Sequence, residues 1–246
     1  MRANVRCMIA ATVLTWGGLV VVAEPPTGEG WTPLFNGKDL TGWKVGRGGP
    51  EKDVPADGDW KVIDGVIDYN AKDGLSLWTG RSYGDFVLHI EWRMKTASDL
   101  YGKETDDAGN PIRHNPDSGV FLRGTGRGQI NIWLNPMGSG EMWGLRTDKR
   151  LPEEEREKQY RPATRADKPL GEWNTFDVTM KGKHITVLLN GAKVIDAPLP
   201  EDFPSSGPIA LQHHGKYDVE KKLWPPAAST VQFRNIYIKE LPAEGP

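Results

Sequence analysis

Short segments in which apolar and polar residues alternate recur along the chain, separated by turns rich in Gly, Pro, Asn and Asp. The strongest, Phe86–Met94, has a large apolar residue at every second position and Val, His, Glu and Arg between them. Side chains alternate between the two faces of a strand, so this segment predicts a strand with one face in a core. No long amphipathic helix is evident. About ten or more short strands at regular spacing predict an all-β sandwich of two packed antiparallel sheets.

Asx-Gly pairs place several turns between these strands. Asp64-Gly65 separates Trp60–Ile63 from Val66–Tyr69, and Asn190-Gly191 follows another strand. Asp64-Gly65 suits a type I′ turn, which needs positive φ at both central residues. Further strands are expected at Leu75–Trp78, Phe176–Lys181, His184–Leu189, Ala192–Ala197, Ile209–His214 and Val231–Glu240. In the last one the apolar phase shifts by one residue, which predicts a β-bulge near Asn235.

Two further features complete the expected fold. The first and last strands are expected to be neighbours in the sandwich. The segment Asp148–Leu170 interrupts the strand pattern and contains the charged run Glu153–Lys158. We expect this segment to be a solvated excursion that forms one or two helical turns at most.

The N-terminal segment has the features of an export signal. Arg2 and Arg6 form a basic start, Met8–Val22 is an apolar run, and small residues follow. This pattern predicts a Sec-type signal peptide over residues 1–23, cleaved after Ala23, and therefore an exported protein, periplasmic or extracellular. An uncleaved membrane anchor is the alternative, because the apolar run approaches the length of a transmembrane helix.

The single cysteine, Cys7, precedes the apolar run, whereas a lipidated cysteine would follow it. We therefore expect no lipid anchor, no disulfide in the mature chain, and no stable membrane insertion after cleavage. Residues 24–30 are predicted to be a Pro/Gly linker and residues 31–242 a single domain stabilised by its buried core.

Composition narrows the class of partner. The net charge is -2 and no basic stripe occurs, so the sequence offers no electrostatic case for nucleic acid. Ten Trp accompany 29 Gly and 19 Pro, so a turn-rich chain has many aromatic rings to place in a core or a cleft.

The stretch from residue 117 to 136 predicts two strands, Ser118–Arg123 and Gln129–Leu134, joined by a Gly-rich connection. In the second strand Ile and Leu share one face, which is core. Gln129, Asn131 and Trp133 share the other. Amides bond hydroxyl groups in both directions and an indole covers the apolar face of a pyranose, so this face resembles the floor of a sugar site. A partly exposed strand with mixed polar residues is the alternative.

A set of segments in a fixed order covers nearly the whole mature chain: Trp31–Trp43, Tyr83–Phe86, Glu91–Arg93, Asp117–Gly124, Glu172–Asn174, Leu189–Gly191, Gly207–Gly215 and Val231–Ile236. In sequence and order these segments resemble the 3-keto-disaccharide hydrolase family. The resemblance implies a concanavalin A-like jelly roll, which agrees with the sandwich predicted from the strands. It also implies cleavage of glycosides already oxidised to a ketone at C3, and so an upstream glycoside 3-oxidoreductase as a functional partner.

The chain departs from the family pattern at one place. Many members have Glu followed two residues later by Gln, where this chain has Gln129 and Asn131. If that Glu is catalytic in other members, this protein either binds without turnover or uses another base.

A ketone at C3 changes the chemistry of cleavage. It acidifies the proton on C2, so a base can remove that proton and the oxygen on C1 can leave by β-elimination, after which water adds to the enone. Such a site needs a general base, a group that stabilises the enolate, and a proton donor for the leaving group. It does not need the two facing carboxylates of an ordinary glycosidase.

Three residues are the candidates for this chemistry. Glu91 lies on the polar face of the strongest strand, and its plainer interpretation is an ion pair with Arg93 or Arg123. His214 has an ordinary pKa near neutrality, and Gln212 shares its predicted strand face. Arg123 is the candidate clamp for an oxyanion or hydroxyl, with a sheet-spanning salt bridge as the alternative.

Trp133 and Trp143 are the candidate stacking rings, although most of the Trp residues must lie in the core. His114 and Asp117 could join His214 around a divalent cation such as calcium, but the spacing matches no metal motif.

We therefore expect an enzyme acting on 3-keto-glycosides, with Glu91, His214 and Arg123 in catalysis. Substrate would be bound by Gln129, Asn131, Trp133, Trp143 and Gln212. A non-catalytic carbohydrate-binding module on the same scaffold is the alternative. A conventional glycoside hydrolase is a third option, but it would need a second carboxylate opposite Glu91.

Overall fold

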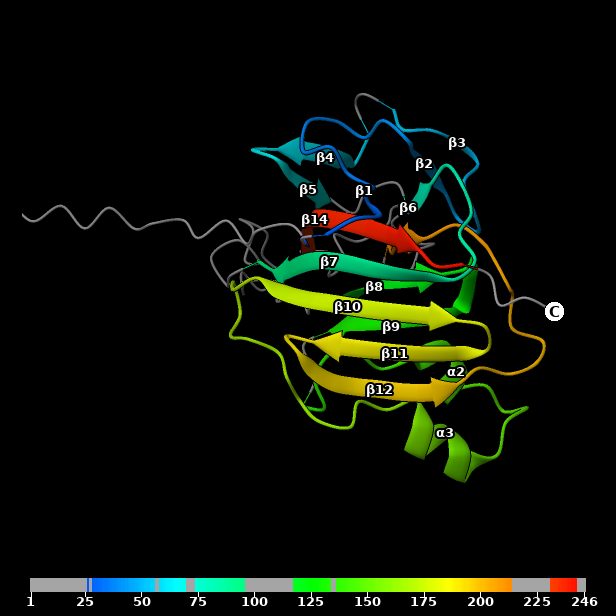
Figure 1. The fold of residues 1–246 in the computed structure, drawn as a ribbon. Helices are drawn as coiled ribbons and strands as arrows, with labels where there is room; N and C mark the ends of the chain where they lie inside the picture. The colour runs from blue at the N-terminus through cyan, green and yellow to red at the C-terminus, as the bar shows by residue number, and fades with distance from the viewer. Residues whose placement is uncertain are drawn as a thin grey trace, which may run out of the picture.

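Two antiparallel sheets pack face to face in the structure, a computed structural model that describes residues 26, 28–55, 58–69, 74–95, 117–133, 136–213 and 231–242. The larger sheet has the strand order β12 (Ala192–Pro198), β11 (His184–Leu189), β10 (Asn174–Lys181), β7 (Phe86–Met94), β14 (Val231–Glu240), β5 (Val66–Tyr69) and β4 (Trp60–Ile63), and β1 (Trp31–Pro33) also pairs with β14. The smaller sheet has the order β3 (Lys52–Asp53), β2 (Trp43–Gly46), β6 (Ser76–Thr79), β13 (Ala210–Leu211), β8 (Asp117–Leu122) and β9 (Thr125–Trp133). In Figure 1 the larger sheet lies in front of β8 and β9.

The inward faces of the two sheets form the core. On β7 and β10 every second side chain from Phe86 to Met94 and from Phe176 to Met180 is buried. On the smaller sheet, Ile130 and Ile132 are 0% exposed. The antiparallel sandwich predicted from strand alternation and the jelly roll implied by the family resemblance are confirmed, as is the pairing of the first strand with the last.

The predicted turns have the expected backbone conformation. Asp64 and Gly65 have φ of 51° and 75°, and Asn190 and Gly191 have φ of 51° and 82°. Positive φ at both central residues is the type I′ requirement. The predicted bulge also occurs, because Asn235 has φ of 48° at a register shift in β14.

Two strand predictions need correction. The strand expected at Ile209–His214 is only β13, because Ile209 N and His213 N donate to the side-chain hydroxyls of Thr79 and Ser76. At both ends of β13, a side-chain hydroxyl therefore accepts the hydrogen bond that a backbone carbonyl of the neighbouring strand would accept in a regular sheet. The hairpin of β8 and β9 turns at Arg123 and Gly124, with φ of 49° and 69°, and not over a long Gly-rich connection.

The helices of the described residues are short. The charged run forms α3 (Glu153–Gln159), which buries none of its residues and has three Glu in its first turn, where the helix dipole favours negative charge. The other, α2 (Trp143–Arg146), was not predicted, because four residues that include a Gly carry no helical periodicity. Neither helix is long enough or apolar enough to span a membrane. The predicted signal peptide, residues 1–23, lies outside the described residues.

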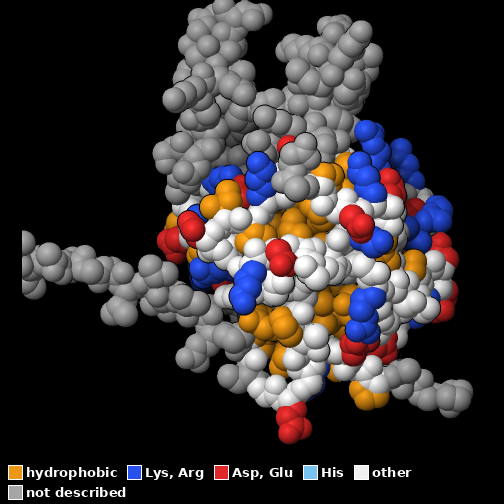
Figure 2. Space-filling model, turned by 90° about the horizontal axis from the view of Figure 1, so that it is seen from above, with side chains coloured by type: hydrophobic (Ala, Val, Ile, Leu, Met, Phe, Trp, Pro, Cys, Tyr) orange, Lys and Arg blue, Asp and Glu red, His pale blue; other side chains and the backbone are white. Residues whose placement is uncertain are grey.

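The face of the molecule seen in Figure 2 has acidic and basic side chains interspersed among apolar ones. No stripe of one charge sign crosses this face, in keeping with the small net charge of the chain.

Arg123 joins the two sheets at the end of the sandwich where β8 ends. Its side chain is 1% exposed and its Nη2 lies 2.8 Å from Oδ1 of Asp85. The remaining donors bond the carbonyls of Gly84 at 3.0 Å, Gly182 at 2.9 Å and Pro204 at 3.2 Å. Burial lowers the pKa of Arg123, and the Asp85 carboxylate opposes that shift. With four of its five N–H donors engaged, the guanidinium ties the smaller sheet to connections of the larger one.

We expect Arg123→Met to lower the free energy of unfolding by about 3–5 kcal/mol, because it leaves the Asp85 carboxylate, whose side chain is only 13% exposed, without its cation. The measurement is urea denaturation followed by circular dichroism. The matched control is Arg81→Met, which breaks an ion pair with Glu240 whose side chains are 63% and 51% exposed, and which we expect to cost less than about 1 kcal/mol. Equal losses for the two variants would contradict this account of Arg123.

Candidate functional site

A cleft of about 290 Å³ lies on the outer face of the smaller sheet, lined by Asp117, Gln129, Asn131, Trp133, Trp143 and Gln212. The alternation of β9 places it there. Ile130 and Ile132 point into the core, so their neighbours point out of the sandwich. All five residues predicted to bind substrate line this one cleft.

The floor of the cleft is a network of three amides that meets above Gly119. Gly119 pairs with Asn131 on one side, and its carbonyl accepts from Gln212 N at 2.8 Å on the other. Across this gap Gln129 Nε2 donates to Asn131 Oδ1 at 2.5 Å and to Gln212 Oε1 at 2.7 Å. A Cβ on Gly119 would lie 3.0 Å from Gln129 Nε2 and 2.8 Å from the carbonyl of Ile130. Because glycine has no side chain, the Gln129 amide can occupy the space above residue 119.

This network leaves the amide nitrogens of Asn131 and Gln212 available as hydrogen-bond donors in the cleft. The acceptor oxygens of Asn131 and Gln212 are both engaged by Gln129. Within the described part of the chain, Asn131 Nδ2 and Gln212 Nε2 make no hydrogen bond, and both residues line the cleft. These two donors suit a ligand oxygen that accepts hydrogen bonds.

Asp117 places a carboxyl group in the same cleft. It is the first residue of β8 and pairs with Trp133, so the two side chains lie on one face of the sheet. Burial raises the pKa of Asp117 from 3.8 to about 7. A carboxyl group with that pKa can take up and release a proton near neutral pH.

Sequence reasoning gave Asp117 only a possible role as a metal ligand. The position of Asp117 follows from the register of the hairpin, which shifts between Phe121 and Leu122 and so places residue 117 opposite residue 133.

Trp143 forms one wall of the cleft from the first position of α2 and is 44% exposed. The helix lies directly on β9, because a Cβ on Gly144 would be only 2.2 Å from the carbonyl of Gly126 and 2.6 Å from the Cα of Arg127. Leu145 anchors it in the core at 0% exposed. The close contact of Gly144 with β9 therefore sets the position of the exposed Trp143 ring.

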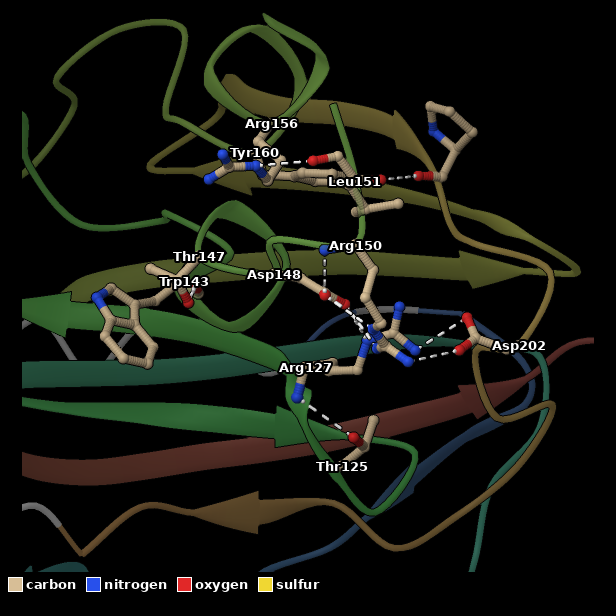
Figure 3. Close-up of polar contacts among 11 residues, drawn as sticks. Thr125, Arg127, Trp143, Thr147, Asp148, Arg150, Leu151, Arg156, Tyr160 and Asp202 are labelled. Carbon is tan, nitrogen blue, oxygen red and sulfur yellow. Dashed lines mark hydrogen bonds and ion pairs between the residues drawn. The ribbon is translucent and has the colours of Figure 1, made fainter. Parts of the chain in front are cut away.

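Four charged residues hold this helix and the loop after it in place (Figure 3). Arg127 lies 3.1 Å from Asp148 and 3.0 Å from Asp202, and Arg150 lies 2.7 Å and 3.3 Å from the same two carboxylates. The hydrogen bond from Arg150 is the main cause that holds the pKa of Asp148 well below its usual range. This network links β9 to the segments that follow α2 and β12.

Glu91 does not lie in the cleft. It is on the outer face of the larger sheet, 1% exposed, and its Oε2 accepts from Arg234 Nε at 2.6 Å. The guanidinium groups of Arg234 and Arg93 lie 4.0 Å and 5.1 Å from the ring of Trp173. The expectation that Glu91 faces the same sugar as Gln129 is wrong, because the two residues belong to different sheets. Its ion-pair partner is Arg234 and not Arg93 or Arg123.

Arg123 is also outside the cleft. It occupies the turn after β8, and its donors are engaged by Asp85 and by three backbone carbonyls. The geometry matches the alternative interpretation, a buried ion pair that spans the sheets, and not a clamp on substrate.

His114 and His214 lie outside the described residues, so the roles given to them stay predictions. Among the described residues no group of three or more His, Cys, Asp or Glu side chains could hold a metal ion.

Known proteins were compared with this chain and this fold. A model of the 3-keto-α-glucoside-1,2-lyase-like domain matches residues 30–239. No curated protein matches the chain. A crystal structure of a candidate glycosyl hydrolase from Parabacteroides distasonis ATCC 8503 is 22% identical with a TM-score of 0.55, covering 87% of this chain and 95% of the other. A second from the same organism is 24% identical with a TM-score of 0.51, covering 87% and 84%. At these identities the likeness shows the fold.

The amide network predicts an effect of a single methyl group. We expect Gly119→Ala to displace the Gln129 amide and to weaken binding of a sugar ligand by about tenfold or more, since the loss of one good hydrogen bond corresponds to about 1–2 kcal/mol. Isothermal calorimetry measures the effect. Gly48→Ala, where a Cβ meets nothing within 4 Å, is the matched control. Unchanged affinity in a folded Gly119→Ala protein would show that the amide network does not contribute to ligand binding.

Proposed function

The chain belongs to the family of 3-keto-α-glucoside-1,2-lyase-like domains, and we propose that it cleaves glycosides that carry a ketone at C3 of the sugar. Membership makes it a carbohydrate-active, glycosyl-hydrolase-like protein. The observation that supports the finer proposal is the carboxyl group of Asp117, with a pKa raised to about 7, in one cleft with the amide donors of Asn131 and Gln212.

In this proposal Asp117 is the general base. Its carboxylate removes the proton from C2, and the electron pair of that C–H bond moves into an enolate on the C3 ketone. Asn131 Nδ2 and Gln212 Nε2 donate to the ketone oxygen, where negative charge develops. A ketone oxygen accepts and cannot donate, which is the property that the donor-rich floor favours.

The enolate then expels the leaving group from C1. The C1–O bond breaks, its electron pair stays on the departing oxygen, and a C1–C2 double bond forms. Asp117 now carries the proton from C2 and can return it to the departing oxygen. Water adds across the double bond, with its oxygen to C1 and a proton to C2, and restores the 3-keto sugar. The reaction needs one carboxyl group and no second carboxylate opposite it.

Trp133 and Trp143 hold the sugar through their ring faces. Trp133 Nε1 donates to the carbonyl of Gly138 at 2.9 Å, so its N–H is already engaged and its ring supplies apolar contact.

We further propose that residues 1–23 direct export to the periplasm or beyond, and that an oxidoreductase acting on C3 of glycosides supplies the substrate.

We expect Asp117→Asn to lower kcat on a chromogenic 3-keto-glucoside by about 10²–10⁴-fold, the usual contribution of a general base. In the wild type, kcat/KM should rise as the pH rises through about 7, because the base must be ionised and the folded-state pKa of Asp117 is raised to that value. Activity should be lost as the pH falls below it. A pH–rate profile of both proteins makes the measurement.

The comparison variant is Glu91→Gln, which removes the other candidate carboxylate. Since Glu91 is buried against Arg234 in the larger sheet, we expect this change to lower the midpoint of thermal unfolding and to leave kcat of the folded protein within about twofold, as for a residue remote from the reacting atoms. Loss of turnover in a stable Glu91→Gln protein, with Asp117→Asn still active, would overturn the assignment of the base.

A non-catalytic carbohydrate-binding module is the second candidate. The observation that favours it is the neutral floor, where Gln129 and Asn131 are amides and bond one another. Binding of a glycan by the wild type with no release from either the 3-keto-glucoside or the unoxidised glucoside would support this candidate. Release from the unoxidised glucoside alone would instead indicate ordinary hydrolysis.

A further inference from the structure

A second cavity of about 320 Å³ adjoins the cleft and has no role in the chemistry described above. Trp92 and Met94 of β7 line it from within the sandwich, and the loop of residues 165–171 lines it from outside. Trp133 belongs to the lining of both spaces, so the cavity and the cleft share one residue.

One residue that lines the cavity, Trp92, carries an unsatisfied donor. Trp92 is 0% exposed, and within the described part of the chain its Nε1 has no hydrogen-bond acceptor. A buried indole N–H usually finds a partner, because a buried donor without one costs free energy. The side chain itself is fixed by packing, with its ring centroid 5.3 Å from that of Phe176. The missing acceptor is what a bound molecule can supply.

The wall of the cavity is held in place by hydrogen bonds. Gly171 N donates to the carbonyl of Met94 at 3.1 Å, and Lys168 N donates to Asn174 Oδ1 at 2.8 Å. The same Asn174 Oδ1 accepts from Asn190 Nδ2 at 2.8 Å, so the loop is anchored to the turn between β11 and β12. The cavity is therefore built into the fold.

We propose that this cavity is the subsite for the leaving group of the glycoside, with a hydroxyl or ring oxygen of that group accepting from Trp92 Nε1. The inference rests on the proposed function, in which the sugar that carries the ketone lies in the cleft. Ligand pockets occupy about 300–1,000 Å³, so this cavity suits a single sugar-sized group. Trp133, Met94 and Leu170 supply apolar contact, and Arg165 and Lys168 add further donors.

The test compares two substrates that differ only in the leaving group, a methyl 3-keto-glucoside and a 3-keto-disaccharide. Leu170→Trp fills the cavity from its 39% exposed rim, and Ile63→Trp, at a 52% exposed position on β4, is the matched control. We expect Leu170→Trp to raise KM for the disaccharide by about tenfold or more, the equivalent of about 1.4 kcal/mol, and to leave KM for the methyl glycoside unchanged. The control should change neither.

Two further variants address the donors. Trp92→Phe removes the N–H and keeps an aromatic ring, and Lys168→Gln changes the rim without touching the core. Each should raise KM for the disaccharide selectively. If Trp92→Phe fails to fold, Leu170→Trp and Lys168→Gln still test whether the cavity is the leaving-group subsite. A KM for the disaccharide that stays unchanged in Leu170→Trp, or rises equally for both substrates, would overturn the subsite.

Failure of the proposed function gives a different result. If the wild type cleaves neither substrate, calorimetry can still compare its affinity for the two compounds. Tighter binding of the disaccharide, lost in Leu170→Trp and kept in Ile63→Trp, would support a second-sugar subsite in a binding protein. Equal affinity for the two compounds in the wild type would reject the subsite.

Discussion

The buried guanidinium of Arg123 is the interaction on which the geometry of this sandwich depends. It belongs to the hairpin of the smaller sheet, yet its hydrogen-bond and ion-pair partners in the described part of the chain lie in connections around the larger one: Gly84, Asp85, Gly182 and Pro204. The Asp85 carboxylate also accepts from Gly182 N at 2.9 Å, so one acidic residue and one basic residue satisfy backbone groups on both sides. A Cβ on Gly207 would lie only 2.2 Å from the backbone carbon of Arg123. The packing here is too tight to allow the hairpin a second position.

Because this hairpin carries the polar floor, its position also sets the site. Asp117 begins β8, and Gln129, Asn131 and Trp133 follow from β9. Gly119 between them has no side chain, and the Gln129 amide crosses the space that this leaves. The Gln129 amide nitrogen therefore engages the acceptor oxygens of Asn131 and Gln212, while these two residues line the cleft. Such a floor is rigid and polar without carrying a charge.

Much of this could be predicted from the sequence, because strands and type I′ turns are local properties. Alternation in β7 and β9 identified the core-facing side chains, and the Asx-Gly pairs identified the tight turns. Alternation also grouped Gln129, Asn131 and Trp133 correctly on one polar face.

The errors arose where the outcome depends on the packing of distant segments. Alternation assigns a residue to one face of its own strand but does not tell which sheet that strand joins. Glu91 and Gln129 both lie on polar faces, and those faces are on opposite sides of the sandwich. Arg123 was misplaced because its left-handed backbone conformation makes it a turn residue. Asp117 was undervalued because its position beside Trp133 depends on a cross-strand register that shifts between Phe121 and Leu122.

The four-charge network beside α2 has a consequence for how an uncharged sugar would respond to its medium. Trp143 stands on a helix that is held partly by Arg150 and Asp202, whose side chains are 64% and 58% exposed. Dissolved ions screen exposed charges over a distance of about 8 Å at physiological ionic strength. Added salt therefore loosens the support of one wall of the cleft without touching the ligand. Affinity for a neutral glycoside would then depend on ionic strength, a behaviour usually read as a sign of a charged ligand.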